Sequence, residues 1–479
     1  MLCKSATVPA AVNPVSPRDD TLLIGHCSIA GREGVESWDK SEDLPLHDCP
    51  TTCGEMGWQH TGIIGRLFRI GSRNVAARSK GLFVQHLQTK PNRMIRSFSS
   101  VFTYWFCHLL GLRHRFPHTV LVLITALCAV GCMEYGPIEP IDMTLPGRGL
   151  FISNEGNFTY GNASLCYYDI TNSQLITDQD GDNDIFLSAN GIPLGDVAQS
   201  VTSYGNTVYV VVNNSGVIFA IDRHTAKITG TIRGLTSPRY MHILSDTKAY
   251  VTDLYARAIT IVDPSTCQIT GRIDVSNGID RQHPTEQMVQ YKNLIFTNCW
   301  SYDDKLLVID SDQDKVVDSI TVGIQPNSIA LDCNNKLWVL TDGGYEGSPY
   351  GQEQPTLSRI DAESRNIELQ LTFPMEDAPS EICLNGSRDS LYFLNKDVWC
   401  MKVTDEQLPQ KPFLKYTGTL YYGLAIDPKT SEVYVADAID YVQYGVVYRL
   451  SPQAVPLVLR PAPSVLWSSH HRTKGQTIV

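Results

Sequence analysis

The sequence predicts an all-β fold, a seven-bladed β-propeller, from three observations. A short phrase, an apolar strand that ends at a polar turn, recurs seven times between Leu150 and Trp467. The steps between successive copies are 53, 41, 47, 51, 43 and 47 residues. No helical pattern lies between the copies, and a period in the forties built of short strands is typical of propeller blades. The copies end at Asp169, Asp222, Asp263, Asp310, Asp361, Thr404 and Ser451.

Each blade is expected to contain four antiparallel strands. In the fifth blade these are 327–331, 336–340, 357–360 and 367–371. The other inner strands are expected near 197–203, 240–244, 287–291, 381–384 and 423–426. The first blade lacks an inner strand, because 149–152 already has the pattern of a second strand. We therefore expect a C-terminal strand, at 464–467, to complete that blade and close the ring, which leaves no sheet edge open.

The segments outside the propeller have different patterns. Residues 1–115 show no sustained period and are expected to be disordered or an over-extended start. Residues 116–132 follow a basic flank at 113–115 and combine a short apolar run with a terminal Cys132, which predicts a signal peptide with a lipobox whose cysteine is lipidated. Residues 133–146 are expected to be a tether, 147–467 the propeller and 468–479 a tail.

Charge excludes one class of partner. Residues 1–115 hold 14 Lys and Arg against 9 Asp and Glu, which leaves 25 against 41, a net charge of −16, for the rest of the chain. An acidic surface repels a phosphate backbone, so no nucleic-acid partner is expected.

The loops between the repeats differ from one another, and they suggest a binding face. In a propeller, the loops from second to third strands and the loops that join blades emerge around one mouth of the central channel. Turn chemistry explains Asn and Asp there, but it does not require Trp300, Tyr302 and Tyr345. Aromatic rings and amides around one mouth suit a large, flat ligand with polar edges. The expected ligand-binding residues are Asn154, Glu155, Asn213, Asn214, Arg239, Tyr240, Asp253, Tyr255, Trp300, Tyr302, Asp342, Tyr345, Tyr422, Asp437 and Tyr441.

The sequence contains none of the common catalytic motifs, so no enzyme, cofactor or metal is expected. Two alternatives stay open. One is a propeller enzyme of the lactonase or lyase type, in which Glu155, Asn213, Asp253 and Asp342 would hold a channel metal. The other is a surface scaffold or adhesion propeller. The acidic run 178–184 is interpreted as a turn at the outer edge of a blade, because it lacks the glycine position and closing Glu of a calcium loop.

The loop phrases also resemble a known family. The phrases that carry the resemblance are GDVAQS (195–200), LTSPRY (235–240), YVTDLY (250–255), TEQM (285–288), CWSYD (299–303), TDGGYEGSPYG (341–351) and EVYVADAIDYVQ (432–443). With these phrases the chain resembles the YncE-like surface propeller lipoproteins of Bacteroidota, a DUF5074 group, from about residue 147 to 452. It departs from their pattern at both ends.

The resemblance implies a function. The BtuG-type members of this group capture cobalamin, vitamin B12, at the outer membrane and pass it to a TonB-dependent, BtuB-like transporter. It implies here a lipid-anchored, surface-exposed outer-membrane protein that binds cobalamin as a ligand, without catalysis, on the loop face.

Overall fold

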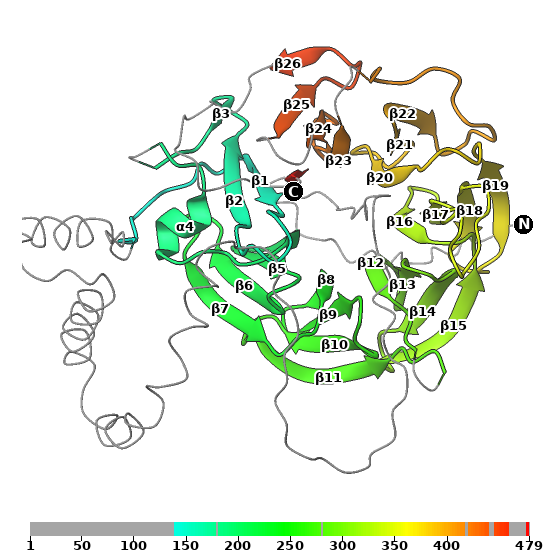
Figure 1. Ribbon diagram of the computed structural model, residues 1–479, viewed down its shortest axis with the longest axis horizontal. Coiled ribbons are helices and arrows are strands. Elements are labelled where there is room, and N and C mark those ends of the chain that lie inside the picture. Colours follow the sequence, from blue (N-terminus) through cyan, green and yellow to red (C-terminus); the bar gives the residue numbers. More distant parts are fainter. Residues whose placement is uncertain are drawn as a thin grey trace, which may run out of the picture. The chain divides into compact units, whose positions relative to one another are not determined.

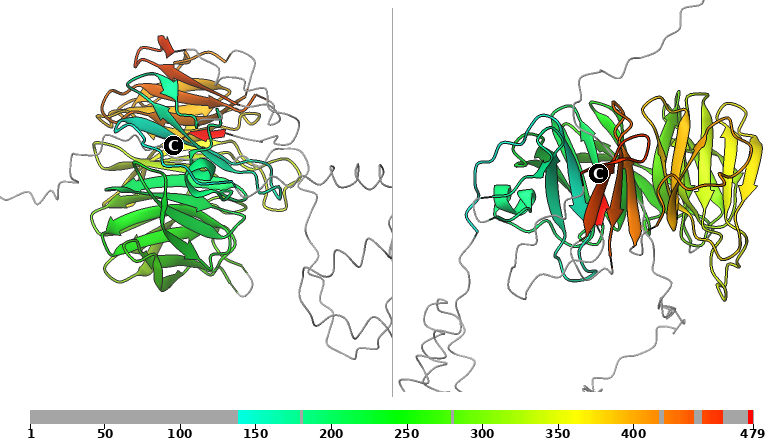
Figure 2. Two further views of the ribbon diagram at one scale, coloured as in Figure 1. Left: turned by 90° about the vertical axis from the view of Figure 1, so that its left-hand side faces the viewer. Right: turned by 90° about the horizontal axis from the view of Figure 1, so that it is seen from above.

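In the computed structural model, seven antiparallel sheets stand in a ring like the blades of a propeller (Figure 1). The structure describes residues 138–178, 181–278, 281–416, 420–439 and 445–458, and the backbone of 476–478. Seen from the side, the strands run between the two faces of the ring (Figure 2). The predicted seven-bladed β-propeller is therefore confirmed.

Blade 1 is completed by the C-terminus, as expected, but through a later segment. Strand β27 (Gln476–Ile478) pairs antiparallel with β1 (Gly149–Asn154), opposite Ile152, Ser153 and Asn154. The sequence-based placement of the closing strand at 464–467 lies outside the described residues, and β27 takes its position in the sheet. The remaining strands of blade 1 are β2 (Ser164–Asp169) and the two-residue β3 (Gln174–Leu175).

Blades 2 to 5 each contain four strands, ordered from the channel outward. Their inner strands begin within two residues of the predicted positions. Blade 2 consists of β4 (Ala198–Tyr204), β5 (Thr207–Val212), β6 (Val217–Asp222) and β7 (Ile228–Arg233). Blade 3 consists of β8 (Pro238–Ser245), β9 (Lys248–Asp253), β10 (Ala258–Asp263) and β11 (Gln268–Asp274). Blade 4 consists of β12 (Thr285–Tyr291), β13 (Leu294–Cys299), β14 (Lys305–Asp310) and β15 (Lys315–Thr321). Blade 5 consists of β16 (Pro326–Leu331), β17 (Lys336–Thr341), β18 (Thr356–Asp361) and β19 (Ile367–Thr372).

Blade 6 is the least regular of the described blades. It has three strands, β20 (Ser380–Leu384), β21 (Ser390–Asn395) and β22 (Asp397–Lys402), and a single bridge from Val398 to Leu414 extends the sheet outward. Blade 7 consists of β23 (Tyr421–Ile426), β24 (Val433–Asp437), β25 (Val446–Leu450) and β26 (Pro456–Val458).

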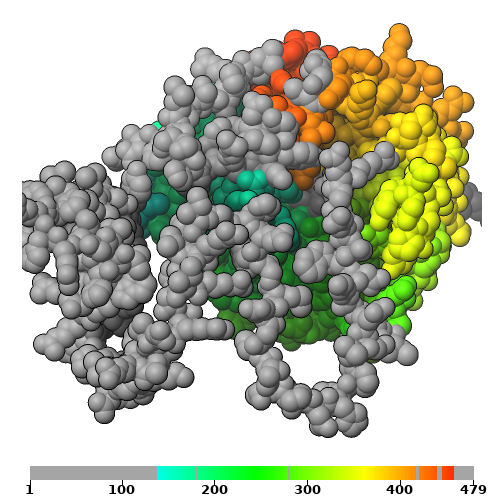
Figure 3. All heavy atoms as spheres, viewed as in Figure 1, coloured from blue at the N-terminus to red at the C-terminus, as the bar shows by residue number. Residues whose placement is uncertain are grey.

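The core lies between blades. Trp338 on β17 is fully buried and packs in one cluster with Phe373, Phe393 and Met401, so blade 5 is joined to blade 6. Equivalent clusters of apolar side chains join other neighbouring blades, which is how a propeller buries both faces of each sheet. The segments drawn in green, yellow and orange meet in direct contact in the space-filling view (Figure 3).

The recurring Asp phrase has a backbone explanation. Asp169, Asp222, Asp263, Asp310 and Asp361 are the last residues of β2, β6, β10, β14 and β18. In each, Oδ1 accepts a hydrogen bond from a backbone N–H two or three residues further on, at distances of 2.7–2.9 Å for the shortest bond. Such a bond stabilises the turn that leads to the outermost strand. The repeat is therefore part of the scaffold.

A short helix, α4 (Ile185–Asn190), is the one described helix, and the sequence did not predict it. It packs against the outer side of blades 1 and 2, where β3 is too short to cover the core (Figure 1). Phe186 contacts Phe219 with ring centroids 5.0 Å apart. The Asp184 carboxylate, in the predicted edge turn, accepts from the backbone N–H groups of Leu165, Phe186 and Leu187 and so caps the helix.

Asp184 should make stability depend on pH. Burial raises the pKa of its carboxyl to about 7, so the folded state binds a proton more tightly than the unfolded state, whose value is 3.8. The free energy of unfolding should therefore fall as pH rises from about 4 to about 7, with the loss complete above that range. Denaturant titrations at several pH values should show a smaller fall in Asp184→Asn, which keeps an acceptor oxygen. An unchanged slope in this variant would contradict the assignment.

Several predictions lie outside the described residues. These are the disordered region 1–115, the signal and lipobox 116–132 with Cys132, and the binding residue Tyr441. Within the part of the chain that is described, we find no helix long and apolar enough to cross a membrane.

Candidate binding face

The register of the blades brings the predicted binding residues to one end of the sheets. In blade 3, Pro238 at the start of β8 pairs with Asp253 at the end of β9. In blade 7, Tyr421 pairs with Asp437 in the same way. Blade-joining loops and second-to-third loops therefore share a face, which we call the binding face.

A β-bulge recurs where the inner strands enter this face. The ladder between the first and second strands is interrupted at the start of β4, β8, β12, β16, β20 and β23. A bulge re-aims the side chain it carries. Here the bulged positions carry buried polar side chains: Gln199, Arg239, Glu286, Asn327, Glu381 and Tyr422.

These bulged side chains bond from blade to blade. Arg239 of blade 3 donates to Gln199 of blade 2 and, from Nε at 2.9 Å, to Oε2 of Glu286 in blade 4. Asn327 of blade 5 donates to Pro379 O at 2.8 Å, on the way to blade 6. The Tyr422 hydroxyl of blade 7 donates to Glu155 of blade 1 at 3.0 Å. Polar side chains thus join neighbouring blades around the inner ring.

Electrostatics support an ion pair in this ring. Burial raises the pKa of Glu286, and the Arg239 guanidinium partly offsets that rise. The side chains are 5% and 4% exposed, so neither charge has much access to water. Arg239 is therefore a structural part of the mouth as well as a predicted ligand contact.

Some of the predicted ligand-binding residues form hydrogen bonds with the protein's own backbone instead. Asp253 accepts from four backbone N–H groups, at Thr236, Ser237, Tyr255 and Ala256. These bonds fix two loops of blade 3 against each other. We therefore assign Asp253 a structural role.

Three other predicted residues have similar internal bonds. Asp437 is fully buried and accepts from the N–H groups of Leu420 and Ile439. Asn213 donates to Ser237 and Pro238 of the next blade, and Asn154 donates to Ser164 and Cys166. Asn214 remains exposed, although it donates to Asp196.

Four tyrosines gather on the binding face over blades 3, 4 and 5. We call Tyr255, Tyr302, Tyr345 and Tyr350 the tyrosine platform; their exposed fractions are 64%, 37%, 38% and 41%. The rings of Tyr302 and Tyr350 stack with centroids 4.7 Å apart, and the hydroxyls of Tyr302 and Tyr345 lie 3.4 Å apart. This bond to Tyr345, with burial and the neighbouring Tyr350 and Tyr255, raises the pKa of Tyr302 to about 12. The rings therefore form one cluster on this face.

The backbone beneath the platform is shaped to present these rings. Tyr302 has φ 65°, a left-handed conformation that is rare for a bulky residue and that often marks a functional position. The loop that carries Tyr345 and Tyr350 turns back on itself through Gly343, where a Cβ would lie 2.2 Å from Glu353 O. The Trp300 indole donates to Asp342 at 3.2 Å and joins the two loops.

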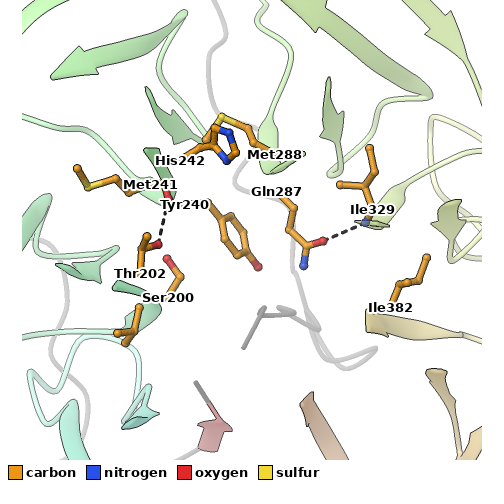
Figure 4. A pocket seen from close by; sticks show the side chains of 10 residues that line it. Ser200, Thr202, Tyr240, Met241, His242, Gln287, Met288, Ile329 and Ile382 are labelled. Atoms are coloured by element: carbon orange, nitrogen blue, oxygen red, sulfur yellow. Dashed lines mark hydrogen bonds between the residues drawn. The ribbon is translucent and has the colours of Figure 1, made fainter. Parts of the chain in front are cut away.

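The central channel offers a smaller site. A cavity of about 290 Å³ lies among the inner strands, with Tyr240, His242 and Gln287 on its wall (Figure 4). Gln287 accepts from the Ile329 N–H, and Thr202 donates to Met241 O. Pockets for drug-sized ligands are roughly 300–1,000 Å³. A ligand larger than this cavity would have to lie on the binding face rather than inside the channel.

The structure thus brings together part of the predicted set. Tyr255, Trp300, Tyr302, Asp342 and Tyr345 lie in neighbouring loops, whereas Tyr240 lines the channel and Glu155 and Tyr422 lie at blades 1 and 7. Sequence analysis missed Tyr350 and Arg281, whose guanidinium carbon lies 5.7 Å from the Tyr350 ring centroid. The second tyrosine of the glycine-rich phrase at 341–351 was the signal that could have revealed Tyr350.

The fold and face define a class of protein, a seven-bladed propeller with an aromatic loop face. Comparison with protein families gives a match over residues 148–449 to the family described as "Domain of unknown function (DUF5074)". The chain belongs to this family. No curated protein matches it.

Solved structures resemble the chain in fold. One is a quinonprotein alcohol dehydrogenase-like protein from Bacteroides thetaiotaomicron, with 14% identity and a TM-score of 0.50, covering 64% of this chain and 74% of that one. Another is the β-propeller domain of Cps50 (Swd1) from Myceliophteria thermophila, with 10% identity and a TM-score of 0.46, covering 62% of this chain and 96% of that one.

Proposed function

We propose that this protein binds, on the tyrosine platform, a large and flat organic ligand that has polar edges. The observation that carries the proposal is the cluster itself: four partly exposed tyrosines over three blades, one of them held in a left-handed backbone conformation. Aromatic faces stack on flat ligands, and phenol hydroxyls can bond to polar groups at the ligand's edge. A rigid sheet scaffold loses little entropy when it binds.

The candidate ligand is cobalamin. Its corrin is wide and rimmed with carboxamides, and it would lie across the platform with Arg281 and the exposed Asn214 available to amide oxygens. The resemblance of the loop phrases to BtuG-type proteins supports this choice. On this proposal the protein is a lipid-anchored, surface-exposed outer-membrane protein, and it hands cobalamin to a TonB-dependent, BtuB-like transporter.

The proposed capture is non-catalytic. A lactonase-type site would need Glu155, Asn213, Asp253 and Asp342 as metal ligands. Each carboxylate oxygen of Asp253 already accepts two backbone N–H bonds, so this residue has no oxygen left for a metal. These bonds support binding over metal-assisted hydrolysis. A scaffold or adhesion propeller would bind a protein partner and no small molecule.

Calorimetric titration of the full chain with cyanocobalamin tests the proposal. We expect saturable binding of one ligand per chain at micromolar protein. Absence of heat and of any spectral change in the corrin at that concentration would overturn the cobalamin proposal, whatever the protein's other partners.

A further inference from the structure

Next to the tyrosine platform, three potential metal ligands converge between blades 3 and 4. His283 lies in the loop that enters β12, Cys299 is the last residue of β13, and Asp303 directly follows Tyr302. One ligand atom from each lies within 4.8 Å of the other two. No other such group is found among the residues that the structure describes.

From this geometry we propose that His283, Cys299 and Asp303 bind a divalent cation of the zinc type, with water as the fourth ligand. An imidazole nitrogen, a thiolate sulfur and a carboxylate oxygen are the donors that Zn²⁺ accepts in proteins. The proposal is independent of the small-molecule ligand.

The carboxylate is already oriented for this role. Asp303 Oδ1 accepts from the backbone N–H groups of Asp304 at 2.8 Å and Lys305 at 3.2 Å. Its other oxygen, Oδ2, lies 2.6 Å from His283 Nδ1. Fixed outer bonds of this kind hold ligands in place before the metal arrives. A cation would enter by separating this His and Asp pair, and it would displace the thiol proton, which passes to solvent water.

The cysteine argues against a nucleophile and fits a ligand. Cys299 is 0% exposed, so a substrate could not approach its sulfur. A bound cation supplies the positive charge that a thiolate needs, and one thiol proton is released on binding.

An entry route exists beside His283. A surface cavity of about 340 Å³ is lined by His283 together with Asp274, Ser276, Asp318 and Ser319. The Asp274 carboxylate on its wall attracts cations and repels anions, whereas Asp318 is paired with Arg365. A hydrated ion could therefore reach the imidazole without opening the blades.

Cobalt and zinc titrations of the full chain test this site. When Co²⁺ is added to apo protein prepared with a chelator, a near-ultraviolet thiolate-to-Co²⁺ absorption band should appear. Zn²⁺ added afterwards should displace Co²⁺ and remove the band. Cys299→Ala should lose the band and one equivalent of bound metal. Asp303→Asn, which keeps the acceptor for the loop N–H groups, should weaken Zn²⁺ binding at this site at least tenfold.

The control is Cys400→Ala, which removes a partly buried thiol outside the trio. Cys400→Ala should bind Co²⁺ and Zn²⁺ as the wild-type protein does. This result would show that loss of a cysteine does not by itself reduce metal binding. The proposal is overturned if apo protein takes up neither ion, or if Cys299→Ala and Asp303→Asn both bind with wild-type stoichiometry and affinity. In that case His283 and Asp303 form a structural hydrogen bond and the three residues do not bind a metal.

Discussion

Arg239→Met is expected to lower the free energy of unfolding by about 3–5 kcal/mol, because it leaves Glu286 buried without its countercharge. The guanidinium also bonds to Gln199, so the change removes contacts among three neighbouring blades. Denaturant titration of the purified chain measures the loss. The effect should be larger at pH 7 than at pH 4, because acid lets Glu286 take up a proton.

Two further variants separate the buried charge from a general loss of packing. The double variant Arg239→Met with Glu286→Leu should regain most of the lost stability, since both charges are then gone. Arg365→Met breaks an ion pair with Asp318 whose side chains are 32% and 43% exposed, and it should cost less than about 1 kcal/mol. Equal losses from Arg239→Met and Arg365→Met would contradict the ion-pair account.

Removal of a platform ring should weaken cyanocobalamin binding strongly. Tyr350→Ala deletes the ring on which Tyr302 stacks. An aromatic side chain that a ligand buries contributes about 2 kcal/mol or more to binding, or roughly 30-fold in Kd. Tyr302→Ala should have at least as large an effect. Calorimetry with each variant measures the change.

The controls distinguish stacking from hydroxyl contacts and from general damage. Tyr302→Phe keeps the ring and should change Kd only severalfold. Tyr204→Ala removes a tyrosine that is 40% exposed at the far end of β4, away from the binding face, and should leave Kd unchanged. Wild-type affinity in Tyr350→Ala would remove the platform from the binding site.

The fold could be predicted because blade repetition is local. Alternation of apolar residues and the Asp that ends five of the seven third strands are visible in short windows, and the structure confirms six inner strands close to their expected bounds. The closing strand could not be located, because three residues from Gln476 to Ile478 carry no repeat of their own. Helix α4 is also only six residues long, too short for a helical period to stand out.

The binding face was predictable in outline but not in detail. Sequence shows that Asp253 follows a strand, but not that four N–H groups converge on it. It also cannot show bulges, which depend on pairing between strands, and these bury Arg239 and Tyr422. The neighbours Tyr302 and Tyr350 are 48 residues apart, so only the folded ring brings them together.

A crystal structure of the full chain with cyanocobalamin tests the central claim most directly. We predict corrin density on the binding face in contact with Tyr302 and Tyr350, within reach of Tyr255 and Tyr345. Density confined to the central channel, or to blades 1, 6 and 7, would contradict the tyrosine platform as the site of capture.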